Sequence, residues 1–66
     1  MIIIRIELNE TKQVKDVCFV GEASTKLEML EAIRTDATSR GESGDLIVEE
    51  DGRTVTNGTS IYKIGQ

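Results

Sequence analysis

Alternating side chains at the start of the chain predict a β-strand over residues 2–8. The even-numbered residues of this segment are all apolar and share one face, whereas Ile3, Arg5 and Glu7 share the other. A second run of β-branched and aromatic residues predicts a strand over residues 14–20. The polar residues 9–12 separate the two strands, so we expect a hairpin whose second strand ends at Gly21.

The following segment predicts one α-helix. Thr25 and Glu28 have the spacing of a capping box, in which each side chain accepts a hydrogen bond from the other residue's backbone amide. A broad apolar stripe follows at helical intervals, with Met29 at its margin, and is formed by Leu27, Leu30, Ile33 and Ala37. Arg40 complements the negative end of the helix, and Gly41 can adopt the left-handed conformation that ends it.

Two dipeptides ending in glycine divide the last third of the chain. Asp51-Gly52 and Asn57-Gly58 favour type I′ turns, in which both central residues have positive φ. They separate three short segments of strand character, over residues 46–50, 53–56 and 59–64. We therefore predict a single small α+β domain over residues 1–66, of order β-β-α-β-β(-β), with a mostly antiparallel sheet and one helix packed on one face.

Apolar residues occupy both faces of several predicted strands. Ile3 opposes its apolar neighbours in the first strand, and Val17 and Phe19 oppose theirs in the second. Near the end of the chain, Ile47 and Ile61 also lie on the opposite strand face from their apolar neighbours. One helix covers only one face of a sheet, so the second face needs a curled sheet, another copy of the chain, or a target protein. We expect Ile3 and Ile47 to belong to this second apolar face.

Size and charge narrow the class of partner. A domain of 66 residues buries a small core, and such scaffolds commonly add disulfides, a metal or oligomerisation. The net charge of −4 argues against direct nucleic-acid binding, because phosphate recognition uses clustered Lys and Arg. No segment approaches the roughly 20 apolar residues of a membrane span. We expect a protein partner, no membrane contact and a cytoplasmic location.

The residue types argue against an enzyme. The chain has no His and a single cysteine, Cys18, within an apolar strand, so we expect a buried and unreactive thiol. Glu49 and Glu50 are consecutive strand residues that point to opposite faces, so they do not converge on one ion. We therefore expect no catalytic residues, no metal site and no cofactor.

Part of the chain resembles a known group of proteins in its layout. The segments FVGEASTKLEMLEAIR, at residues 19–34, and DLIVEEDGRTV, at residues 45–55, carry the strand–helix–hairpin order in question. Together with the short length, they resemble very small phage-encoded inhibitors of bacterial immunity, including some type I anti-CRISPR proteins. The resemblance covers about residues 17–56 and implies a protein that blocks a host effector by sitting on it. Some inhibitors of this shape have basic contact surfaces, whereas this chain is acidic, and no contact residue is carried over.

Three functions follow as hypotheses. The first is a non-enzymatic protein-binding module, a phage or mobile-element inhibitor that occludes a host defence protein. The second is a homo-oligomeric structural or accessory protein, such as a homodimer, whose open sheet face is buried by self-association. The third is a ubiquitin-like carrier or adaptor, which the β-β-α-β-β order resembles, although the chain ends in Gly65-Gln66 instead of Gly-Gly. For the first, we expect the partner to contact the open face and a charged hairpin end, at Ile3, Arg5, Ile47, Glu49, Glu50, Asp51 and Arg53.

Overall fold

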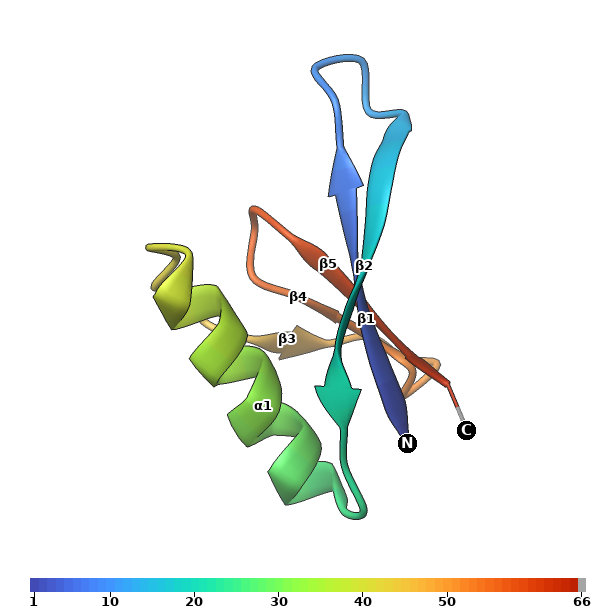
Figure 1. Cartoon of the computed structure of the whole chain (residues 1–66), viewed down its shortest axis with the longest axis vertical. Coiled ribbons are helices and arrows are strands. Elements are labelled where there is room, and N and C mark those ends of the chain that lie inside the picture. Colours follow the sequence, from blue (N-terminus) through green and yellow to red (C-terminus); the bar gives the residue numbers. More distant parts are fainter. Residues whose placement is uncertain (66) are drawn as a thin grey trace.

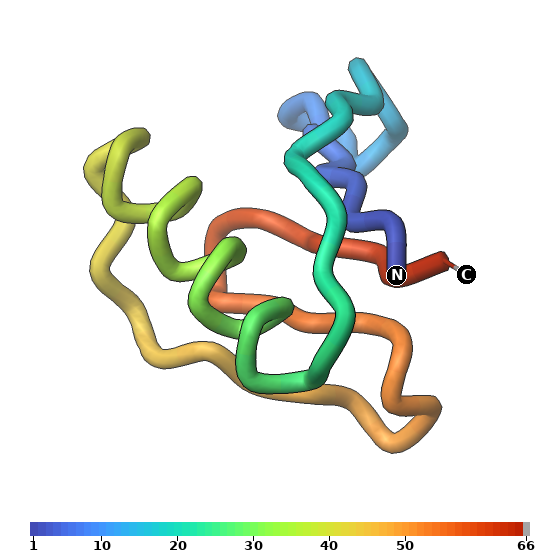
Figure 2. The backbone as a smooth tube through the Cα atoms, turned by 60° about the horizontal axis from the view of Figure 1, so that its bottom comes forward, coloured from blue at the N-terminus to red at the C-terminus, as the bar shows by residue number. Residues whose placement is uncertain are grey.

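A computed structural model describes residues 1–65 and confirms the predicted α+β fold. The elements are β1 (Ile2–Leu8), β2 (Val14–Glu22), α1 (Lys26–Ser39), β3 (Ile47–Val48), β4 (Thr54–Thr56) and β5 (Ile61–Gly65). The strands form one antiparallel sheet in the order β2-β1-β5-β4-β3, so the first and last strands pair in its middle. Figures 1 and 2 show the helix against one side of this sheet, and the tip of the β1–β2 hairpin projecting beyond the other strands.

Several strand boundaries and both glycine turns differ from the predictions. Gly21 does not end the second strand, because it pairs with Ile3 and β2 continues to Glu22. The three C-terminal strands are shorter than predicted. Gly52 and Gly58 have positive φ, but Asp51 and Asn57 do not, so the turns are not type I′. The Asp51 carboxylate instead accepts hydrogen bonds from the backbone amides of residues 53 and 54, as side chains of turn residues often do.

The helix begins and ends as predicted, but its buried face is rotated. The Glu28 amide donates to Thr25 Oγ1 at 3.1 Å, and Gly41 adopts positive φ beyond the last turn. The buried helix residues are Met29, Ile33 and Ala37. Leu27, which we placed on the apolar stripe, is 67% exposed, because it precedes the buried Met29 by two residues and so points to roughly the opposite side of the helix. Met29, placed at the margin, is core.

The prediction for the two faces of β1 is wrong. Ile3 is fully buried and packs in the core with helix residues Met29 and Ile33, so the odd-numbered residues of β1 face the helix. In the register of the sheet, Ile3 pairs with Ile64 and Arg5 pairs with Tyr62, and both partners are buried. Directly opposed residues of antiparallel strands point to the same face. The even-numbered isoleucines therefore lie on the face away from the helix.

Helix side chains compensate the charged residues on the covered face. Both carboxylate oxygens of Asp36 accept hydrogen bonds from Arg5 Nη1, at 2.8 and 2.7 Å, and Tyr62 Oη donates to the same carboxylate at 2.7 Å. Four residues further along, Arg40 Nη2 lies 3.1 Å from Glu7 Oε1. Charge-assisted hydrogen bonds of this kind allow Arg5 and Glu7 to lie under the helix. No helix within residues 1–65 is long and apolar enough to cross a membrane.

Candidate protein interface on the open sheet face

An uninterrupted row of uncharged side chains crosses the sheet on the face away from the helix. The registers place Val17 of β2 opposite Ile6 of β1, and Ile6 opposite Ile61 of β5. They continue the row from Ile61 to Thr56 of β4 and from Thr56 to Ile47 of β3. The row therefore reaches from one edge strand to the other and carries four aliphatic side chains and one threonine.

A second row lies beside the first and contains the most exposed apolar side chain on this face. Phe19 of β2 pairs with Ile4 of β1, which pairs with Lys63 of β5 and then with Thr54 of β4. Phe19 is 68% exposed. We call the residues of the two rows, together with Leu8 and Val14 at the hairpin end, the open face. A contiguous apolar surface of this kind on a small domain typically marks an interface.

Lys63, in the second row of the open face, is hydrogen-bonded to its neighbour across the sheet. Its Nζ donates to Thr54 Oγ1 at 2.8 Å, and that hydroxyl donates to the Asp51 carboxylate at 2.9 Å. Hydrogen bonds from the Arg53 amide and from Thr54, with Lys63 nearby, lower the pKa of Asp51. The Lys63 ammonium is thus linked to the Asp51 carboxylate through the Thr54 hydroxyl, and the row from Val17 to Ile47 has no charged residue.

Irregularities in β2 prevent the long edge of the sheet from pairing freely. The register with β1 shifts between Ile3 and Ile4 and again between Glu7 and Leu8, and such bulges increase the local twist of an edge strand. The Val17 amide donates to the Asp16 side chain at 2.8 Å, so this group is not free to bind another strand. At the opposite edge β3 has only two residues. These features are typical of sheets that resist edge-to-edge association.

A shallow hollow lies at one end of the open face. The hollow has a volume of about 240 Å³ and lies between Leu8 and Ile61 of the open face and the turn between β4 and β5. Its lining residues are Leu8, Lys12, Thr56, Gly58, Thr59, Ser60 and Ile61. This volume is below the roughly 300–1,000 Å³ of small-molecule sites. The hollow is therefore smaller than a typical small-molecule site.

The structure separates the predicted contact residues into three groups. Ile47 is 56% exposed and lies on the open face, as predicted. Ile3 and Arg5 lie on the covered face, where Ile3 is core and Arg5 is paired with Asp36, so neither is an exposed contact residue. The predicted charged hairpin end is exposed beside the open face and consists of Glu49, Glu50, Asp51 and Arg53.

The sequence interpretation missed most of the central residues of the open face. Ile4 and Ile6 were assigned to the opposite face from Ile47, although they share it. One signal in the sequence could have corrected this error. Asp36 and Arg40 lie four residues apart, so they share one face of the predicted helix. Their charges are opposite to those of Arg5 and Glu7, which also share a face, and this complementarity indicates that the charged face of β1 lies under the helix.

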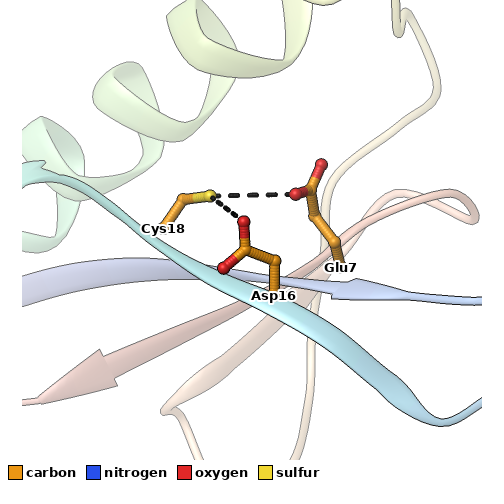
Figure 3. A group of neighbouring side chains, drawn as sticks. All are labelled: Glu7, Asp16 and Cys18. Atoms are coloured by element: carbon orange, nitrogen blue, oxygen red, sulfur yellow. Dashed lines mark hydrogen bonds between the residues drawn. The ribbon is translucent and has the colours of Figure 1, made fainter.

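A thiol and two carboxylates meet on the covered side of the hairpin (Figure 3). Cys18 Sγ lies 3.8 Å from both Glu7 Oε2 and Asp16 Oδ2, and the three potential ligand atoms lie within 4.8 Å of one another. These are donor types that zinc accepts, but Glu7 is ion-paired with Arg40 and Asp16 accepts the Val17 amide. The group is therefore accounted for as a hydrogen-bonded cluster within the hairpin. Cys18 is half-buried, not fully buried as predicted.

The electrostatics of the covered face are those of a structural network. Burial opposes ionisation of Asp36, but the hydrogen bonds from Tyr62 and Arg5 outweigh it and lower the pKa of this carboxyl. Burial and the hydrogen bond to Asp36 raise the pKa of Tyr62 to about 12. Both shifts stabilise the protonation states that the groups already have at neutral pH. A general acid or base would instead have its pKa moved toward the working pH.

Comparisons with protein-family models, with curated proteins and with solved structures find no match to this chain. The fold and the open face define a class of object, a small α+β module with one sheet face covered by a helix and the other free.

Proposed function

We propose that this chain is a non-enzymatic protein-binding module that acts by occluding its partner with the open face. The observation that carries the proposal is the uncharged row from Val17 to Ile47, which crosses all five strands on the face that the helix leaves free. The centres of protein interfaces are depleted in charge and enriched in aromatic side chains, and Phe19 beside this row fits that description.

The surroundings of the open face support the same proposal. Glu49, Glu50 and Arg53 are exposed at the hairpin end and can form a polar rim around the apolar centre. Charges at a rim accelerate encounter and select partners, whereas buried apolar side chains supply most of the affinity. The layout resemblance to phage-encoded inhibitors adds the suggestion that the partner is a host defence protein.

The test compares one substitution on the open face with a matched one on the helix. Tagged protein is used to capture partners from cells that express it, and binding of each purified captured protein is then measured. Val17→Lys should weaken binding about thirtyfold or more, because an unpaired charge within an interface costs about 2–5 kcal/mol. Leu27→Lys places the same charge on an exposed apolar site of the helix and should leave binding within about twofold.

The proposal fails if every captured protein binds the two variants equally well. In that case the contact lies outside the open face, and the uncharged row has another explanation.

A further inference from the structure

We infer that, when no partner is bound, the open face is covered by a second copy of this chain, in a symmetric dimer in which Phe19 of each copy fills the hollow of the other. The inference rests on the proposed function in that it uses the same face. It adds a regulation of that face, because the partner and the second copy compete for it.

The open face has the shape complementarity that a two-fold interface needs. In such an interface one surface patch meets its own copy, so a protrusion and the site that receives it must both lie on that patch. Phe19 is the protrusion, exposed to 68%, and the hollow beside Leu8 and Ile61 is the receiving site. Both belong to the same face of the same sheet.

The positions of these two features define where the two-fold axis lies. Ile6 pairs with Val17 on one side and with Ile61 on the other. Phe19 lies two residues from Val17 along β2, and the hollow begins at Ile61 and Leu8. Ile6 therefore lies between protrusion and hollow. When the two sheets pack face to face, a two-fold axis that lies between them and passes over Ile6 places Phe19 of each copy against the hollow of the other.

The charges of the open face permit this association. A two-fold axis over Ile6 places Val17, Ile6 and Ile61 near the centre of the dimer, and none of these residues is charged. Two lysines border the uncharged row: Lys63 is hydrogen-bonded to Thr54, whose hydroxyl donates to the Asp51 carboxylate, and Lys12 lines the hollow. No charge therefore lies within the row itself, where a buried unpaired charge would be most costly, and the Lys12 ammonium lies at the border of the hollow.

A stable dimer would use a modest share of the surface of this chain. A standard interface uses about 800 Å² from each partner. That is a little under a fifth of the 4503 Å² of accessible surface of this chain. The exposed apolar side chains that the open face offers to such a patch are Leu8, Val14, Val17, Phe19 and Ile47. Pairing at the edges is hindered by the Asp16 contact in β2 and by the shortness of β3. Face-to-face packing is thus the route open to a second copy.

The first experiment measures mass in solution by sedimentation equilibrium. The wild-type chain should show a dimer of twice 7.3 kDa that dissociates on dilution. Phe19→Asp should raise the dissociation constant on the order of a thousandfold, because the two-fold axis makes each substitution act twice. Leu27→Asp, at an equally exposed apolar site on the helix, should leave the constant within about threefold. Circular dichroism of each variant establishes that it is folded.

The second experiment tests the geometry by disulfide formation in a Cys18→Ala background. A chain with Phe19→Cys is mixed with a chain with Thr59→Cys, whose site lines the hollow. The mixture should form a cross-linked heterodimer, and each chain alone should not. Leu27→Cys mixed with Thr59→Cys is the negative control.

Each other outcome overturns the inference. A chain that stays monomeric at all concentrations has no second copy on its open face, although the capture experiment with Val17→Lys can still support a partner there. A dimer that tolerates Phe19→Asp, or that gives no heterodimer cross-link, uses another surface. Conversely, a confirmed dimer together with captured partners that ignore Val17→Lys refutes the proposed function alone.

Discussion

The assignment of the two faces of β1 predicts that neighbouring isoleucines respond very differently to the same substitution. Ile3 is fully buried between the sheet and the helix, whereas Ile2, the preceding residue, is 40% exposed on the opposite face. Ile3→Val and Ile2→Val each remove one methyl group, at sites one residue apart. The pair therefore isolates burial from chemistry and from position in the strand.

The expected magnitudes follow from the packing. Removing a methyl group from a filled core site typically costs 0.5–1.5 kcal/mol, so Ile3→Val should lower the free energy of unfolding by about 1 kcal/mol. For a domain of this size, that corresponds to a decrease in Tm of about 4–8 °C. Ile2→Val should change the free energy of unfolding by less than about 0.5 kcal/mol. Ile3→Ala is less suitable, because its cost of about 2–5 kcal/mol approaches the total stability of about 3–10 kcal/mol expected for 66 residues.

Urea unfolding followed by circular dichroism measures both variants. The concentration should be one at which the chain is monomeric, so that dimer dissociation does not contribute to the transition. If Ile2→Val costs more than Ile3→Val, the two faces of β1 are reversed. The open face as defined would then not exist, and both the proposed interface and the inferred dimer would be lost with it.

Two further predictions test the covered face and the helix. Tyr62 is the single tyrosine of a chain without tryptophan, so its tyrosinate absorbance should titrate near pH 12 in the folded protein and near pH 10 in urea. Because the folded-state pKa of Tyr62 is raised, the stabilisation by its hydrogen bond to Asp36 is fully present below about pH 10 and is lost as the pH rises toward 12. Equal titration midpoints in the folded and urea-unfolded protein would refute this contact. Thr25→Ala should lower the free energy of unfolding by about 1 kcal/mol, because it removes the N-cap of the helix. Thr38→Ala, at an exposed site within the helix, should not lower it. Equal effects of the two substitutions would argue against the cap.

The sequence was sufficient to predict those features that depend on neighbouring residues. The helix N-terminus follows from Thr25 and Glu28, three residues apart, and the structure shows the Glu28 amide bonded to the Thr25 hydroxyl. The element order follows from local periodicity and from the glycine positions. The exact turn type did not follow, because the side chains of Asp51 and Asn57 accept backbone amides and stabilise turns in which only the glycine has positive φ.

The choice of face could not be made locally, because it depends on contacts between distant residues. Arg5 is compensated by Asp36, 31 residues away, and Glu7 by Arg40, 33 residues away. Viewed without these partners, a strand face with two charges is expected to be exposed, and the purely apolar face is expected to be core. The same error placed Ile3 on the open face, although it is core, whereas Ile47 does lie exposed on that face.

This reversal also explains why so apolar a face is left uncovered. The helix side of the sheet has a hydrogen-bonded network in which Arg5 and Glu7 are paired with the specific partners Asp36, Tyr62 and Arg40. The even-numbered face of β1 has isoleucines and no polar groups that specify a partner within the chain. A helix placed there would bury apolar area but leave Arg5 and Glu7 without their ion pairs. Specific polar contacts therefore decide which face the helix covers, and the more apolar face remains available for intermolecular association.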